Sequence, residues 1–217
     1  MRRRWGNAPA ALVALLWAGL LAVGAAADTR DRFAVSGQAL RYDTEAAPGV
    51  REITQADIGY LRKMLRARPD IDTLILNSTG GDYYAALEMA RIVVDAEIDT
   101  VIDGECSSSC TLIFLGGEGR QLQRGSLIGF HQTSWTAEGI EGFYDANQSH
   151  YGWEDPFDLA QWLYRDTQDE VRRHLAFMFE RGVAPDFALE TIRDQGDDLW
   201  YPDRGALERA GVLRERP

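Results

Sequence analysis

Three short segments of the sequence carry groups that could do chemistry together. NSTGGD (residues 77–82) contains paired glycines, whose backbone N–H groups can face an open site and hold a phosphate or an oxyanion. ECSSSC (residues 105–110) contains both cysteines of the chain and three serines. GFHQ contributes His131. A serine with a histidine and backbone donors nearby is the equipment of nucleophilic acyl transfer.

Each segment lies at the end of a predicted strand, so the three can meet only if these strands lie side by side in one sheet. Short apolar runs at residues 72–78, 99–103 and 126–131 predict buried strands. Because open α/β sheets bind ligands at the carboxyl edge, we expect all three segments at one edge. Singly each is a weak signal, since Gly-Gly turns are common, a serine at a helix start is usually a cap, and a lone histidine is more often structural.

The rest of the chain alternates strands with helices. Predicted helices cover residues 53–67, 83–95, 111–115, 157–181, 186–193 and 206–210, and a further short strand covers residues 199–201. Residues 133–156 show no periodicity and predict a long loop, which in a compact domain is usually functional or mobile. The length of 217 residues and the 45% hydrophobic content suit a single α/β domain.

These segments resemble the ClpP serine-protease branch of the ClpP/crotonase superfamily. LILNSTGGDYYAALEMARIV, GECSSSCTLIFLGGEGR and SLIGFHQ are similar to the family motifs N-S-P-G-G, G-x-x-x-S and H-Q, over residues 72–132 and more loosely to residue 212. The resemblance implies a spiral of strand-helix units. It also implies Ser108 as the nucleophile, His131 as its base, and the backbone N–H groups of Gly81 and Ser109 as the oxyanion hole.

The sequence departs from the family motifs at two places. Thr79 replaces the proline, and Ser109-Cys110 replaces a Met-Gly pair. Neither change removes a side chain that the implied mechanism needs, because an oxyanion hole uses backbone donors.

The third member of the implied triad is the least determined. ERAGV (residues 208–212) resembles the family's C-terminal E-x-G-L-V segment, and counting back from it indicates Asp198, with Asp197 and then Asp194 as alternatives. Acidic residues in such a turn are otherwise usually just solvated.

The implied reaction is hydrolysis of a peptide bond without a cofactor. Ser108 attacks the carbonyl, His131 takes up and returns the proton, and Asp198 orients the imidazolium. Two cysteines four residues apart and three scattered histidines offer little to a zinc ion. A Ser-Lys dyad, which exported membrane-associated relatives use, is disfavoured because the single lysine, Lys63, lies in a predicted surface helix upstream.

Cys106 and Cys110 flank the serines and leave three interpretations open. In an oxidising compartment two neighbouring thiols tend to form a disulfide. A spacing of four residues suits a disulfide only marginally in a regular helix, so Cys106 would have to lie before the helix. The alternatives are two small packed side chains or, less favoured, a cysteine nucleophile.

The N-terminus predicts export. Residues 1–27 combine three arginines, an apolar run and an Ala-Ala-Ala cleavage site, as in a signal peptide, although an uncleaved membrane anchor is the alternative. Residues 28–217 would then form the folded domain, in the periplasm or facing it. Loss of residues 1–27 removes three arginines and no acid, changing the formal charge from −11 to −14, which argues against nucleic acid or anionic lipid as partner.

Several functional alternatives follow from the same residues. We expect an exported peptidase acting on a peptide or protein. A catalytically silent scaffold in the cell envelope and, less favoured, a crotonase-like acyl-CoA enzyme are the alternatives. The resemblance also implies homo-oligomers.

Other polar and aromatic residues receive no firm role from the sequence. Nothing assigns a function to His150 or His174. The aromatic residues of segment 133–156 could form a lid over the site or simply a packed loop; they are Trp135, Tyr144, Tyr151 and Trp153.

Overall fold

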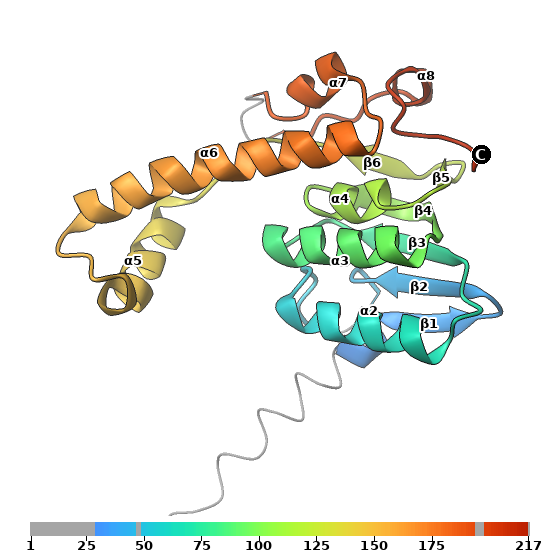
Figure 1. Ribbon diagram of the computed structural model, residues 1–217, viewed down its shortest axis with the longest axis horizontal. Helices are drawn as coiled ribbons and strands as arrows, with labels where there is room; N and C mark the ends of the chain where they lie inside the picture. The colour runs from blue at the N-terminus through green and yellow to red at the C-terminus, as the bar shows by residue number, and fades with distance from the viewer. Residues whose placement is uncertain (1–28, 47–48, 194–197, 217) are drawn as a thin grey trace, which may run out of the picture.

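The computed structural model describes residues 29–46, 49–193 and 198–216, and these form one mixed α/β domain (Figure 1). Within them lies a six-stranded sheet of order β1-β2-β3-β4-β5, with β6 also paired to β4. The strands are β1 (Phe33–Ser36), β2 (Ala39–Asp43), β3 (Thr73–Ser78), β4 (Asp99–Ser107), β5 (Arg120–Leu122) and β6 (Leu127–Gly129). β1 and β2 pair antiparallel, and the other pairings are parallel. The single α/β domain predicted from the sequence is confirmed.

Strand β4 is longer than predicted because Gly104 bends it without ending it. Gly104 has φ +127°, a conformation that glycine adopts at little cost. A Cβ at Gly104 would also lie 2.2 Å from Asn77 Oδ1, which accepts a hydrogen bond from the Glu105 N–H at 2.9 Å. Before the bend β4 pairs with β5, and after it with β6. The predicted end at residue 103 was therefore wrong, and the strand runs on to Ser107.

Three helices pack around the central strands. α2 (Gln55–Ala67) begins with a capping box between Thr54 and Asp57, and α3 (Tyr83–Ala96) is capped by Asp82, which accepts a hydrogen bond from the Ala85 N–H. α4 (Cys110–Leu115) is buried at every position, so it lies in the core that α3 also contacts. Burial on this scale anchors the segment immediately after the ECSSSC serines.

The C-terminal part of the chain covers the end of the sheet that carries β6. Its helices are α6 (Pro156–Glu180), α7 (Pro185–Glu190) and α8 (Arg204–Arg209). α7 ends earlier than the predicted residue 193. The strand predicted at residues 199–201 is a single antiparallel bridge between Trp200 and Phe130, because only this pair exchanges hydrogen bonds.

The loop predicted at residues 133–156 is wrong, because most of it forms helix α5 (Ala137–Tyr151). Thr136 caps α5 by accepting a hydrogen bond from the Gly139 N–H, and Gly152 ends it in the left-handed conformation. Two internal glycines and the absence of a buried face within α5 hide its periodicity. We call residues 137–164, which comprise α5 and the start of α6, the arm, since they extend away from the sheet (Figure 1).

The predicted signal peptide or anchor at residues 1–27 lies outside the described residues. Among the helices that the structure describes, none combines the length and the apolar character needed to cross a bilayer.

Candidate functional site

The three chemical segments meet at the carboxyl ends of β3, β4 and β6. Ser78 at the end of β3 pairs with Cys106 of β4, and Ser107 of β4 pairs with Gly129 of β6. The next residues of each strand therefore lie side by side. His131 Nε2 is 2.7 Å from Ser108 Oγ, within hydrogen-bond reach.

Ser108 lies in a backbone conformation that non-glycine residues rarely adopt, with φ +55°. Its N–H donates to the Gly129 carbonyl at 3.0 Å, and its own carbonyl accepts from the N–H and the hydroxyl of Thr111. These bonds tie the residue to β6 on one side and to the start of α4 on the other. Such local strain costs about 1–3 kcal/mol and persists only where neighbouring contacts enforce it.

The glycine pair after β3 lies directly against Ser108. A Cβ at Gly80, where φ is +111°, would be 2.7 Å from the Ser108 Cβ, so only glycine permits this approach. The Gly80 carbonyl accepts a hydrogen bond from the Ile53 N–H at 2.8 Å. Because C=O and N–H point in opposite directions across a trans peptide, this bond turns the Gly81 N–H away from Ile53.

Two backbone N–H groups beside Ser108 have no hydrogen-bond acceptor among the described residues: those of Gly81 and Ser109. The Ser109 hydroxyl donates to the Gly81 carbonyl at 3.0 Å and so links the two. Both residues line the same cavity as Ser108. Free N–H groups at such a position suit a developing oxyanion.

A cavity of ≈ 160 Å³ opens next to Ser108 and His131. Leu112 and Phe130 contribute apolar surface, and the polar contributions come from residues that include Thr111, His174 and Thr191. Burial lowers the pKa of His174 to about 4, so this imidazole is neutral at pH 7. Its Nε2 lies 3.4 Å from the Thr191 hydroxyl. The cavity has the size of one side chain and a polar component.

Comparison with known proteins agrees with this architecture. No protein-family model and no curated protein matches the chain. ClpP1 from Listeria monocytogenes matches in structure with a TM-score of 0.55 at 15% identity, covering 89% of this chain and 94% of that one. The chain has a ClpP-like fold.

Two further solved structures are similar to the chain. A point mutant of the Listeria ClpP1 matches with a TM-score of 0.53 at 16% identity, covering 75% of this chain and 84% of that one. A putative enoyl-CoA hydratase from Streptomyces coelicolor A3(2) matches with a TM-score of 0.48 at 12% identity, covering 85% of this chain and 65% of that one, a likeness too low to support an argument. At these identities the likeness concerns the fold alone.

On this ClpP-like fold, Asp198 is exposed and makes no hydrogen bond to His131 in the described part of the chain. The bridge pairs Phe130 with Trp200 through hydrogen bonds of 2.9 and 2.8 Å. In an extended continuation of this pair, Leu199 lies opposite His131, so Asp198 faces the other side. Asp194 and Asp197 lie outside the described residues.

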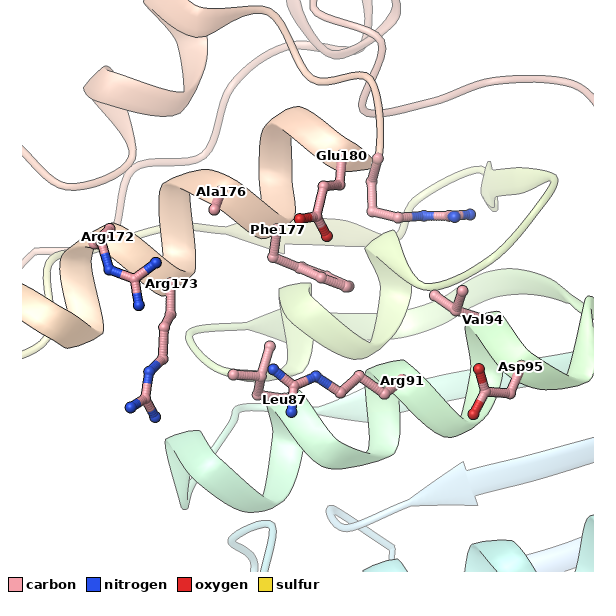
Figure 2. A pocket seen from close by; sticks show the side chains of 10 residues that line it. Leu87, Arg91, Val94, Asp95, Arg172, Arg173, Ala176, Phe177 and Glu180 are labelled. Atoms are coloured by element: carbon pink, nitrogen blue, oxygen red, sulfur yellow. The ribbon is translucent and has the colours of Figure 1, made fainter.

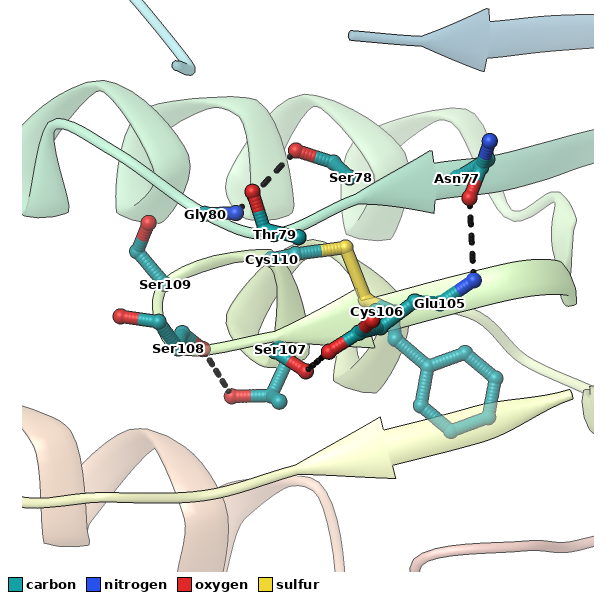
Figure 3. The surroundings of a disulfide bond; sticks show 12 residues. Asn77, Ser78, Thr79, Gly80, Glu105, Cys106, Ser107, Ser108, Ser109 and Cys110 are labelled. Atoms are coloured by element: carbon teal, nitrogen blue, oxygen red, sulfur yellow. Dashed lines mark hydrogen bonds between the residues drawn. A yellow bond between two sulfur atoms is a disulfide. The ribbon is translucent and has the colours of Figure 1, made fainter. Parts of the chain in front are cut away.

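Cys106 and Cys110 are joined by a disulfide, with their Cα atoms 5.3 Å apart (Figure 3). The short spacing is compatible with a bond because Cys106 belongs to β4 and only Cys110 to α4. Both are fully buried, and no cysteine is free, which removes the cysteine nucleophile and the pair of packed thiols. The bond closes the turn that presents Ser108.

Ser107 is engaged in a different network. Its hydroxyl donates to Glu105 Oε1 at 2.6 Å, and the Tyr201 hydroxyl donates to the same oxygen at 2.8 Å. Ser107 is buried and is absent from the lining of the Ser108 cavity. Of the three serines in ECSSSC, Ser108 alone has a side chain beside His131.

A second hollow, of ≈ 500 Å³, lies between α3 and α6 away from Ser108 (Figure 2). Its four arginines all have partners: Arg91 pairs with Glu88, Arg172 and Arg173 pair with Asp169, and Arg181 donates to backbone carbonyls at the end of α4 and to Glu118. No group of metal-ligating side chains gathers within the described ranges. The cavity beside Ser108 is therefore the candidate site.

The site also contains residues that the sequence did not mark. His174 and Thr191 belong to α6 and to the turn after α7, and no local pattern connects them with Ser108. α6 and α7 pack against each other, and Phe187 of α7 contacts Phe130, which follows β6, so that His174 and Thr191 reach the cavity.

Proposed function

We propose that the protein is an exported serine peptidase that hydrolyses peptide bonds with Ser108 and His131. The 2.7 Å contact between Ser108 Oγ and His131 Nε2 carries the proposal. It lies beside a cavity and two backbone donors, those of Gly81 and Ser109, which have no acceptor in the part of the chain that the structure describes. This is the geometry that acyl transfer requires of a nucleophile, a base and an oxyanion hole.

The proposed reaction proceeds through an acyl-enzyme. Ser108 Oγ attacks the peptide carbonyl carbon while His131 Nε2 takes the hydroxyl proton, and the Gly81 and Ser109 N–H groups stabilise the oxyanion. His131 then gives the proton to the leaving amine as the C–N bond breaks. Water, deprotonated by His131, attacks the ester, and release of the acid returns the proton to Ser108.

Asp198 remains the proposed residue that orients His131. For this role its carboxylate must reach Nδ1, which requires residues 198–199 to rotate relative to the Phe130–Trp200 bridge. The bridge supports the proposal in one respect, because it fixes this segment beside His131. Asp197 and Asp194 are the alternatives.

Export is part of the proposal. The disulfide between Cys106 and Cys110 supports an oxidising compartment such as the periplasm, since structural disulfides are rare in the cytosol. Residues 1–27 would serve as signal peptide or anchor. Homo-oligomerisation, implied by the resemblance, stays a prediction.

The two alternative functions have less support. A silent scaffold has no need for a serine hydroxyl held within hydrogen-bond reach of a histidine, or for a strained Ser108. Nothing in the described residues favours an acyl-CoA substrate over a peptide.

Cleavage of a peptide library by the purified chain, followed by mass spectrometry, tests the proposal. Wild type and Ser107→Ala, the neighbouring serine outside the cavity, should cleave the same bonds. Ser108→Ala should lower the rate by at least about a thousandfold. Cleavage that persists in folded Ser108→Ala, or no cleavage by wild type, would contradict the proposal.

A further inference from the structure

A large groove runs outward from the catalytic cavity between the start of α3 and the arm. Its volume is ≈ 940 Å³, enough for several residues of a peptide. It shares its inner wall with the catalytic cavity through Gly81, Tyr83, Thr133 and Ser134. A peptide whose carbonyl lies at Ser108 would therefore extend into the groove.

The outer walls of the groove are aromatic. The ring centroids of Phe143 and Trp162 lie 5.4 Å apart, those of Tyr151 and Trp162 5.6 Å, and those of Trp135 and Phe143 5.3 Å. Trp135 is 46% exposed and Tyr151 45%, so these faces are open to a ligand. Aromatic faces bind apolar side chains and also cations, through the negative charge of the ring face.

Two carboxylates on α6 favour a cation over an apolar side chain as the ligand of these aromatic faces. Asp166 and Glu170 line the groove one helical turn apart, and neither forms an ion pair within the described residues. The Tyr84 hydroxyl donates to Asp166 at 3.2 Å, which orients that carboxylate. The one arginine of the groove lining, Arg173, is paired with Asp169. The groove therefore presents uncompensated negative charge to its occupant.

Glu170 connects this charge to the catalytic cavity. Burial raises the pKa of Glu170, a hydrogen bond from Thr133 opposes the rise, and the negative charge of Asp166 adds to it. A cation bound between the two carboxylates would relieve this repulsion and favour the ionised form of Glu170. Thr133 follows His131 by two residues, a span of about 7 Å in extended chain. Glu170 thus lies within reach of a substrate residue close to the scissile bond.

We propose that this groove binds a peptide substrate through a lysine or arginine side chain placed within a few residues of the scissile bond. The cation lies between the aromatic faces and the carboxylates of Asp166 and Glu170. This specificity rests on the proposed peptidase function, because a peptide whose carbonyl reaches Ser108 is the ligand expected in the adjoining groove. The acidic charge of the chain, −11, also favours approach of cationic peptides.

Equilibrium binding to full-length Ser108→Ala tests the proposal without requiring turnover. The probes are fluorescent peptides derived from cleaved library members, or random peptides if none is cleaved, identical except for arginine, norleucine or glutamate at one position. The arginine peptide should bind about tenfold more tightly than the norleucine peptide, a typical effect of a hydrogen-bonded charge. His131→Ala serves as the binding protein if Ser108→Ala does not fold.

A matched pair of substitutions on α6 assigns the effect to the groove. Glu170→Gln and Asp166→Asn should each reduce the arginine preference severalfold. Glu180→Gln removes the same charge from the same helix, but in the hollow of Figure 2, and should preserve the preference. Equal affinity for the three peptides, or a preference that survives in Glu170→Gln/Asp166→Asn, would overturn the proposal.

Failure of this specificity is distinguishable from failure of the peptidase function. Reaction of wild type with a fluorophosphonate probe reports the Ser108–His131 pair whatever the peptide preference. Labelling together with charge-independent binding would overturn the groove proposal alone. Charge-selective binding without labelling would support the groove and contradict the peptidase.

Discussion

The strand ends that carry Ser108 and the arm that flanks them are built in opposite ways. Ser108 lies between a buried disulfide, a hydrogen bond to β6 and a fully buried α4. In the arm, α5 has no buried residue, and Phe157 and Tyr164 of α6 are 81% and 72% exposed. In our proposal the reaction takes place where backbone and core fix the position of each atom, and the peptide binds where aromatic surface remains open.

This difference has an energetic consequence. A position enforced by several buried contacts can hold a strained residue such as Ser108, because the surrounding core offsets the strain. Exposed aromatic rings contribute little to folding stability and remain available to a ligand. We therefore expect substitutions at the strand ends to affect stability and rate together, and substitutions in the arm to affect binding.

The largest expected effect is the loss of catalytic rate on substitution of Asp198, at the edge of the strand-end region. Asp198→Asn should lower kcat on the order of 10³–10⁴-fold, because His131 would lose the carboxylate that orients and stabilises it. Steady-state kinetics on a cleaved peptide measures this, with Asp197→Asn and Asp194→Asn as matched controls. A wild-type rate in Asp198→Asn would remove Asp198 from the mechanism, and a large loss in one of the controls would identify its replacement.

Two phenylalanines on α6 test the contrast in stability. Phe177 lies in the core and is 7% exposed, so Phe177→Ala should lower the free energy of unfolding by about 4 kcal/mol. Phe157→Ala in the arm should lower it by less than about 0.5 kcal/mol. Urea unfolding gives both values. Similar losses at the two positions would show that the arm belongs to the core.

His174 makes the stability of the strand-end region dependent on pH. Its pKa is lowered to about 4 in the folded chain by burial, from 6.5 when unfolded, so only the unfolded state takes up the proton between these values. The contribution of His174 to the free energy of unfolding should be complete above pH 6.5, and the free energy should fall by up to about 3 kcal/mol as the pH approaches 4. The difference in the free energy of unfolding between wild type and His174→Gln should change between pH 6.5 and pH 4. Identical pH profiles for the two proteins would contradict it.

The disulfide should contribute a smaller share. Closing so short a loop stabilises the chain by about 2 kcal/mol in the chain-entropy view. Reduction of wild type, or the double change Cys106→Ala/Cys110→Ala, should lower the free energy of unfolding by that amount, measured with urea. The double variant itself should not respond to reductant. An unchanged stability of wild type on reduction would show that the bond does not constrain the turn.

The core of the site could be predicted because its determinants are local. Gly80, Gly81 and Ser108 each follow an apolar strand within a few residues, and parallel strands bring their carboxyl ends to one edge. His131 is placed by the same rule. The disulfide remained open, because the sequence does not show that β4 continues past Gly104 and carries Cys106 in extended conformation.

Features that depend on tertiary packing could not be predicted. The α5 helix lacks a buried stripe, so periodicity does not reveal it. The hairpin of β1 and β2 turns at Gly37, and its signal is short alternation around one glycine. His174 and the aromatic groove come from the arrangement of α6 over the sheet edge. The position of Asp198 depends on the single bridge between Phe130 and Trp200, and this bridge does not fix the direction of the Asp198 side chain.

The central claim is that Ser108 is a nucleophile activated by His131. Reaction of the folded chain with a fluorophosphonate probe, followed by digestion and mass spectrometry, tests it most directly. We predict one adduct, on Ser108, which His131→Ala greatly slows. An unlabelled wild-type chain that is shown to be folded, or an adduct on another serine, would contradict the claim.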